Sequence, residues 1–361
     1  MSEKESTQGS RLLALDYLRG FFVAVIIIDH LNKFPSIGSL LTGEARLWVT
    51  AAEGFVMISG FLIGYVRGFK GLKLPFRVIA GKLLQRSLLL YVWVIITTII
   101  FAAINWYLEF IPNIPSPPTP DGDWWALFVD VATFHSAALW TYFLLLYTIF
   151  LFFSIGIVYL LRNNQARLAV VLTLIVYLVG LTHDIKWMKW QVIFFLPTIA
   201  GYYFPRIITW WQGHSENKRL WFRRSIYSSS LLLLVASMTF IFHPQILPLS
   251  IVGPVNSLFN IETFGPLRIL LSGLWFIALA LFFDQIFPFL QRWTFGVLEY
   301  IGTHSLTAYI AHGFIICAFN AILLLSGITE NYILDSAICI LGILAVYGFI
   351  RIPLIAKIIP R

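Results

Sequence analysis

Charged residues are scarce in this sequence. Only 12% of its 361 residues are Asp, Glu, Lys or Arg, and 59% are hydrophobic, whereas a soluble domain is about 25% charged. This shortage excludes an ordinary cytosolic domain and a disordered chain. One membrane-spanning helix needs about 20 mostly apolar residues, so the composition predicts an all-α, polytopic helix bundle embedded in the lipid bilayer.

Cysteine is nearly absent as well. The two cysteines, Cys317 and Cys339, lie inside apolar runs, which excludes a metal cluster built on cysteine and argues against a structural disulfide. The sequence also lacks a P-loop, a Rossmann glycine fingerprint and a His-Glu-x-x-His motif. We therefore expect neither a bound metal nor a bound cofactor.

Ten apolar runs predict about ten membrane-spanning helices. They are residues 13–32, 47–66, 87–104, 138–161, 168–182, 192–211, 226–242, 268–287, 305–325 and 334–356. If the N-terminus is cytoplasmic, the inner segments hold 19 of the 25 lysines and arginines, and Arg19 lies within the first run. The outer segments hold Lys33, Arg46, Lys186, Lys189 and Arg268. This asymmetry predicts that both termini are cytoplasmic, and basic residues scattered in this way do not indicate a nucleic-acid partner.

The segments outside these runs suggest a simple domain organisation. Residues 1–10 are polar and predict a disordered tail, followed by a single membrane domain at 11–361. The outer loop 105–137 is acidic and rich in proline. The stretch 244–266 is apolar but broken by prolines, so it belongs at an interface or in a protein-lined cavity. Residues 288–304 are expected to form a half-helix or an inner loop.

The first apolar run contains four ionisable residues, Asp16, Arg19, Asp29 and His30. Arg19 and His30 are 11 residues apart, so on a helix they share one stripe and are separated by about 16 Å. Asp16 can pair with Arg19 three residues later. One interpretation is an ion pair at the inner interface and a snorkelling histidine at the outer one. The other is a polar track through the bundle, because charges at membrane depth are costly and typical of functional sites.

The second apolar run carries a single carboxylate, Glu53, which needs a partner. Arg19 and His30 are the nearest candidates, because consecutive helices usually lie side by side. Further along the same run, Gly60 and Gly64 form a small-residue face that predicts close helix packing.

The start of the ninth run places Ser305, Tyr309 and His312 on one helix face. Ser305 and His312 are about 10 Å apart along the axis, too far for the hydrogen bond of a nucleophilic Ser-His pair. We therefore predict that the three side chains form a hydrogen-bonding seam in the bundle, and we count them among the candidate substrate-binding residues.

Three stretches together resemble the membrane acyltransferase-3 superfamily, most closely its OpgC-type branch, which modifies osmoregulated periplasmic glucans. Residues 15–30 resemble the Arg-x10-His first helix of that family, including the Asp-His ending of the glucan branch. Residues 51–61 are similar to its second-helix signature, and residues 302–312 to its late Gly-x-x-Ser-Leu…His element. The resemblance runs from one end of the chain to the other, and ten helices is the family's usual number.

The resemblance implies a multi-pass O-acyltransferase of the bacterial inner membrane. It would move an acetyl or succinyl group from cytoplasmic acyl-CoA to a hydroxyl of an extracytoplasmic glycan. The basic inner segment at 67–86 suits an anionic donor, although it also fits the positive-inside rule alone. Trp124 and Trp125 in the outer loop could stack on sugar rings of the acceptor, but they are equally typical of an interfacial aromatic belt.

The resemblance also implies roles for the charged residues of the first two helices. His30 would act as general base, or would itself accept the acyl group, because imidazole suits either task near neutral pH. Asp29 or Glu53 would orient its ring. Arg19, beside Asp16, would hold the donor phosphates or polarise the thioester carbonyl.

A proton-coupled membrane transporter is the alternative. It would also place Asp, Glu, Arg and His within helices. Such transporters typically have inverted repeats or paired broken helices, and no internal repeat is visible in this sequence. The identity of the acyl group, the acceptor and the oligomeric state stay open at this stage.

Overall fold

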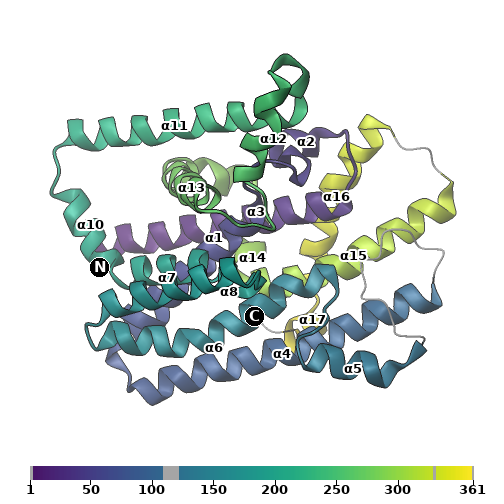
Figure 1. The fold of residues 1–361 in the computed structure, drawn as a ribbon, viewed down its shortest axis with the longest axis horizontal. Coiled ribbons are helices and arrows are strands. Elements are labelled where there is room, and N and C mark those ends of the chain that lie inside the picture. The colour runs from purple at the N-terminus through teal and green to yellow at the C-terminus, as the bar shows by residue number, and fades with distance from the viewer. Residues whose placement is uncertain (1–2, 109–121, 328–330, 360–361) are drawn as a thin grey trace.

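The computed structural model describes residues 3–108, 122–327 and 331–359, without the side chains of 3–12, 139, 249 and 356–358. Within these residues every regular element is a helix, which confirms the predicted all-α fold (Figure 1). Helix α1 begins at Glu3. The division into a tail at 1–10 and a membrane domain stays a prediction.

Each of the ten apolar runs contains a helix. These helices are α1 (Glu3–Leu31), α3 (Ala51–Leu62, continued by the π-helix η2, Ile63–Phe69), α4 (Phe76–Tyr107), α6 (Tyr142–Arg162), α7 (Ala166–Thr182), α9 (Val192–Tyr202) with α10 (Phe204–Gln212), α11 (Glu216–Phe242), α13 (Pro266–Trp293), α15 (Ser305–Ser326) and α16 (Tyr332–Ile350). Short helices connect them: α2 (Ile37–Thr42), η1 (Gly43–Ala45), η3 (Lys70–Lys73), α5 (Trp124–Ala132), η5 (Leu139–Thr141), α8 (Lys186–Trp190), η6 (Pro244–Ile246), α12 (Leu249–Leu258), α14 (Val297–Thr303) and α17 (Pro353–Ile358).

Among the described residues, seven helices are long and apolar enough to cross a membrane, or eight with one bent span. The bent span is Lys186–Tyr202 followed by Phe204–Gln212, at an angle of 63°. Pro205 sits in the first turn of α10, where its missing N–H interrupts the helical ladder. Helices α1 and α7 would complete the predicted set of ten. The apolar part of α1 contains several charged residues, and α7, with 17 residues, is shorter than the other spans. The count of ten and the cytoplasmic termini stay predictions.

The broken segments form short helices. Residues 244–266 contain η6 and α12, and residues 288–304 hold the end of α13 and then α14. Of the predicted outer loop 105–137, residues 109–121 lie outside the described residues. The rest of that loop includes α5, whose first turn is capped by the Asp123 side chain.

Glycines allow two pairs of helices to approach very closely. Helix α3 with η2 packs on α9, and a Cβ on Gly64 would lie 1.8 Å from the carbonyl oxygen of Thr198. Helix α1 packs on α14, where a Cβ on Gly302 would lie 1.8 Å from the carbonyl oxygen of Asp16. Any side chain at these positions would push the helices apart, so the predicted packing role of Gly60 and Gly64 is confirmed.

Helix α11 stands apart from the tightly packed part of the bundle (Figure 1). It lies along one edge, parallel to the long axis of the view, and α13, seen nearly end-on, separates it from α1. Exposed Leu, Ile and Val side chains cover α4, α7 and α11. Apolar residues on the outside of a helix bundle are what a lipid environment requires.

Candidate active site

Two histidines from distant parts of the chain meet inside the bundle. His30 comes from the last turn of α1 and His312 from the middle of α15. His30 Nδ1 and His312 Nε2 are 2.8 Å apart, and the rings stack with centroids 5.0 Å apart. The indole of Trp140 lies beside both rings, at 6.2 Å from His30 and 6.4 Å from His312.

The contacts of His312 determine the proton positions in this pair. His312 Nδ1 is hydrogen bonded to the backbone carbonyl of Tyr309, and a carbonyl can only accept, so His312 Nδ1 carries the proton. In a neutral imidazole the other nitrogen is then an acceptor. His30 Nδ1 must therefore donate to His312 Nε2. The lone pair of His30 Nε2 is left as the basic atom of the pair.

The predicted orienting carboxylates are not the partners of His30. Asp29 interacts with the Thr42 hydroxyl and the Ala45 backbone amide, because the adjacent helix position points about 100° away from His30. Its atom Oδ1 is buried without a hydrogen-bond partner. His312, which we predicted to belong to a seam within α15, takes the position beside His30.

Glu53 is fully buried, and its partner is Arg268 rather than Arg19 or His30. Arg268 Nε lies 2.6 Å from Glu53 Oε1, and Arg268 Nη2 is also in contact with it. Glu53 Oε2 accepts from the Thr50 backbone amide and hydroxyl, at 3.1 and 2.7 Å. The prediction was wrong because Arg268 was assigned to an outer loop, whereas it lies in the first turn of α13, 3% exposed.

Arg19 lies near the middle of α1, 11 positions before His30 and so about 16 Å from it along the helix axis. The predicted ion pair with Asp16 is confirmed, with Nη2 2.8 Å from Oδ1. Arg19 Nε also donates to the carbonyl of Gly302, at 2.5 Å. Arg86 and Tyr147 are close enough to act on Arg19 electrostatically.

Arg67 joins the same group, because it too feels Arg86 and Tyr147. Arg86 Nε is buried and has no hydrogen-bond partner. Three guanidinium groups therefore gather near one tyrosine, in what we call the arginine cluster (Arg19, Arg67 and Arg86). Asp16 balances the charge of Arg19, so the net positive charge of the cluster comes from Arg67 and Arg86 and favours an anion nearby.

Two small cavities adjoin Tyr309, one on the side of Tyr147 and the other on the side of His312. The first is lined by residues that include Phe55, Tyr147 and Tyr309. The second is lined by residues that include Tyr309, Trp140 and His312. Each is only about 10 Å³, the size of one water molecule. Tyr309 borders both, is 3% exposed, and its hydroxyl has no hydrogen-bond partner. Ser305 opens the same helix at the arginine end.

A larger pocket of about 270 Å³ lies beside Arg268. Its lining includes Trp48 and the amides Asn256 and Asn260, from the segment predicted to enclose a cavity. The Trp48 indole N–H donates to Asn256 Oδ1 at 2.8 Å, and its ring stacks on Phe259 with centroids 4.2 Å apart.

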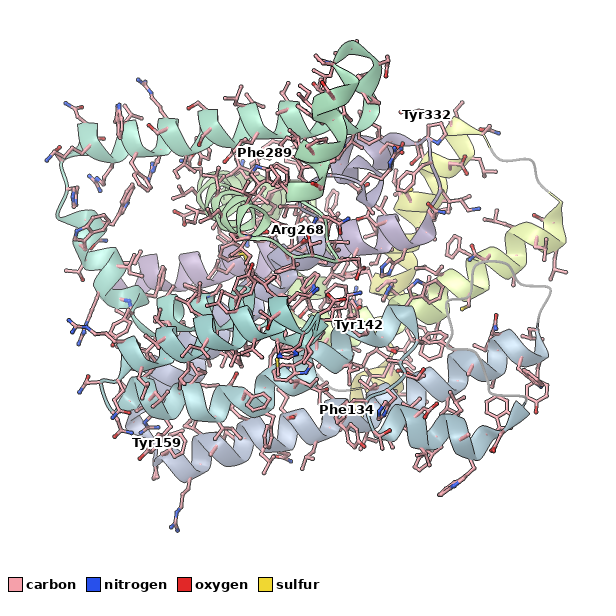
Figure 2. The ribbon with its side chains drawn as sticks, in the orientation of Figure 1. Phe134, Tyr142, Tyr159, Arg268, Phe289 and Tyr332 are labelled. Carbon is pink, nitrogen blue, oxygen red and sulfur yellow. The ribbon has the colours of Figure 1, made fainter. Side chains whose placement is uncertain are left out.

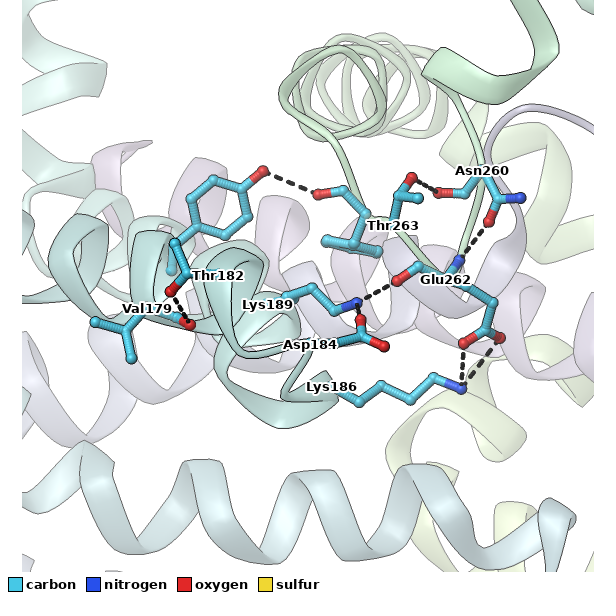
Figure 3. Close-up of polar contacts among 10 residues, drawn as sticks. Val179, Thr182, Asp184, Lys186, Lys189, Asn260, Glu262 and Thr263 are labelled. Carbon is cyan, nitrogen blue, oxygen red and sulfur yellow. Dashed lines mark hydrogen bonds and ion pairs between the residues drawn. The ribbon is translucent and has the colours of Figure 1, made fainter.

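Ion pairs hold the loop that forms one wall of this pocket (Figure 3). Lys189, 2% exposed, lies 2.6 Å from Asp184 and also bonds the Glu262 carbonyl. Lys186 pairs with the Glu262 carboxylate at 3.0 Å. The hydrogen bond from Lys189 holds the pKa of the Asp184 carboxyl below its usual value of 3.8. On the other side Arg268, central in Figure 2, bonds the Phe259 carbonyl at 2.6 Å.

Trp124 and Trp125 lie elsewhere, on α5. Trp124 stacks on Tyr107 of α4, and Trp125 is 72% exposed and stacks on Phe128. Neither lines the pocket beside Arg268. In the described part of the chain, no group of three His, Cys, Asp or Glu residues could hold a metal ion.

Comparison with known proteins gives one match, to the family described as OpgC protein, over residues 11–353. No curated protein and no solved structure matches the chain. The family match covers α1 with its histidine, α3 with Glu53 and α15 with His312. The chain therefore belongs to the OpgC protein family.

Proposed function

We propose that this membrane protein is an O-acyltransferase that moves an acyl group from a cytoplasmic acyl-CoA to a carbohydrate hydroxyl on the outer side of a bacterial inner membrane. The observation that carries the proposal is the free lone pair of His30 Nε2, which the hydrogen bonds of His312 and Tyr309 leave available. A base held in one tautomer is what activation of a hydroxyl requires.

The acceptor hydroxyl gives its proton to His30 Nε2 while its oxygen attacks the thioester carbonyl carbon. The C–S bond then breaks, and the CoA sulfur leaves with the proton that His30 held. In an alternative order, Nε2 attacks the thioester first and CoA leaves as the thiolate; the hydroxyl then attacks the acyl-imidazolium carbonyl, the C–N bond breaks, and the hydroxyl proton passes to the thiolate. In both orders the His30 ring becomes positively charged. His312 Nε2 accepts the hydrogen bond from His30 Nδ1–H, in the position that the carboxylate occupies in a catalytic triad.

The donor would bind along α1. The arginine cluster offers three cations to the phosphates of CoA, and the fork of a guanidinium suits phosphate oxygens. The acyl arm would pass the two cavities at Tyr309, which adjoin Tyr147 and His312, and the unpartnered Tyr309 hydroxyl can donate to the thioester oxygen. Since the cavities are only water-sized, passage of the acyl arm requires the helices to move.

The acceptor would bind in the pocket beside Arg268. Its amides, Asn256 and Asn260, can exchange hydrogen bonds with sugar hydroxyls, and the exposed Arg46 adds donors at the rim. The acyl group itself, acetyl or succinyl, is to be identified by the assay below.

The test is CoA thiol release by the reconstituted protein with acyl-CoA inside vesicles and glycan outside. His30→Ala should lower the rate by roughly 10²–10⁴-fold, the usual contribution of a positioned base. His135→Ala, an exposed histidine on the α5 side, is the matched control and should leave the rate unchanged.

The same vesicles separate the transferase from the transporter. Glycan or proton uptake without thiol release would contradict the transferase and support a proton-coupled transporter. Full thiol release by folded His30→Ala protein would show that the base is another group.

A further inference from the structure

Helix α11 encloses a large cavity against the rest of the bundle. Ser237 is the one residue of this 27-residue helix that is buried. Between α11, α13, α1 and α3 lies a cavity of about 480 Å³, lined mostly by apolar side chains such as Leu234, Phe276 and Leu279. Leu231 and Phe282 line it and are also exposed, so the cavity opens on the outer surface of the bundle. A ligand of drug or lipid-chain size would fit this volume.

Three polar groups of the residues that line this cavity lack hydrogen-bond partners. The Tyr227 hydroxyl, the Ser230 hydroxyl and the Trp275 indole N–H all belong to residues lining it, and each is buried without a hydrogen bond. Buried polar atoms without partners are rare in folded proteins and need an explanation, such as a bound molecule. Three such atoms therefore lie in the walls of one cavity, where small side-chain movements would bring them to a bound polar group.

The cations of α11 continue the same surface. Arg219, Arg223, Tyr227, Ser230 and Leu234 follow helical spacing and lie within about 80° of one another. The Nε atoms of Arg219 and Arg223 are buried and unpartnered, and neither residue forms an ion pair with a described carboxylate. Arg223 lies about 6 Å along the axis from Tyr227 and acts on it electrostatically. Along this face of α11, from its N-terminal end, the side chains are therefore first cationic, then hydroxyl-bearing and then apolar.

Asp284 of α13 also acts on Tyr227 electrostatically. The charged groups near this surface are therefore the cations Arg219 and Arg223 and the carboxylate of Asp284. The positive charge that remains suits a singly charged anion.

We propose that the gap between α11 and α13 is a binding site for an anionic phospholipid of the surrounding membrane. Its phosphate would contact Arg219 and Arg223, and one acyl chain would lie in the cavity. Basic pockets between membrane helices are suited to anionic lipid headgroups. The gradient of charge along α11 matches such a lipid from headgroup to chain, whereas a zwitterionic lipid would bring its own cation next to the two guanidinium groups and leave their net positive charge uncompensated.

Native mass spectrometry of the delipidated full-length protein tests the site. Phosphatidylglycerol and phosphatidylcholine with the same two oleoyl chains are the probes. The wild type should hold one phosphatidylglycerol at least tenfold more tightly than phosphatidylcholine and should melt at a higher temperature with it. The double variant Arg219→Gln/Arg223→Gln should lose this preference. The control double variant Lys218→Gln/Arg224→Gln, which removes two exposed charges of the same helix, should keep it.

A second pair of variants tests whether the acyl chain of the lipid lies in the cavity. Ser230→Trp places an indole in the cavity and should weaken binding of both lipids, while Ser228→Trp, on an exposed position, should not. Equal binding of the two lipids, or equal losses in both arginine and control variants, would contradict the specific site. Failure of the folded wild type to hold phosphatidylglycerol would overturn the proposal. Because the readout is lipid binding, each outcome is independent of acyl transfer.

Discussion

The histidine pair and the Glu53–Arg268 pair are both ionisable contacts deep in the bundle, but their hydrogen bonding differs. Both oxygens of Glu53 are occupied, one by Arg268 and the other by Thr50. The His30 ring uses only one nitrogen in the pair and leaves the other with a lone pair. The histidine pair therefore keeps one ring nitrogen available for chemistry, whereas both carboxylate oxygens of Glu53 are used to hold the bundle together.

Breaking the Glu53–Arg268 pair should produce the largest effect on the folded protein. Glu53→Gln leaves a buried guanidinium without its charge partner, which typically costs about 3–5 kcal/mol of stability. We expect a large fall in melting temperature and in yield of monodisperse protein. The paired replacement Glu53→Leu/Arg268→Met should recover much of the loss, because a well-packed apolar pair removes both charges. If Glu53→Gln melted like the wild type while transfer was lost, Glu53 would be a catalytic residue after all.

Removing the partner of His30 should have a smaller effect, and one confined to activity. His312→Ala frees the His30 ring to adopt the wrong tautomer, so transfer should fall by roughly 10–100-fold, less than for loss of the base itself. Because His312 acts through His30, the double variant His30→Ala/His312→Ala should be no slower than His30→Ala. Additive losses in this cycle would mean that the two histidines act independently.

Arg19→Lys should have the smallest effect of the three. Lysine keeps the charge but loses the planar fork that contacts both Asp16 and Gly302. We expect KM for the acyl-CoA to rise by about tenfold, equivalent to about 1.4 kcal/mol, with a modest fall in kcat. Arg77→Lys, at an exposed position of the same predicted inner face, is the control. A fall in kcat with unchanged KM would place Arg19 at the thioester rather than at the phosphates.

Much of the architecture could be predicted from the sequence because it depends on local patterns. Apolar runs indicate helices, Asp16 and Arg19 are neighbours on one helix, and Gly60 and Gly64 lie on one packing face. These features require only the geometry of a single helix.

The contacts that define the site could not be predicted in the same way. His30 and His312 are 282 positions apart, and Glu53 and Arg268 are 215 apart. Such pairs depend on which helices become neighbours: α1 and α3 do pack on each other, as expected of consecutive helices, but the partner of Glu53 comes from α13. One signal was present: Arg268 begins an apolar run, and a cation at that position needs a buried partner as much as Glu53 does.

The identity of the reacting nitrogen is the most direct test of the account. Histidine methylated on either ring nitrogen can be introduced at position 30 of the full-length protein, and thiol release can be followed in vesicles. Methylation of Nε2 blocks the free lone pair, so transfer should fall at least 100-fold. Methylation of Nδ1 removes the bond to His312 but leaves Nε2 free, so the loss should resemble that of His312→Ala. Near-normal transfer by the Nε2-methylated protein would contradict the central claim.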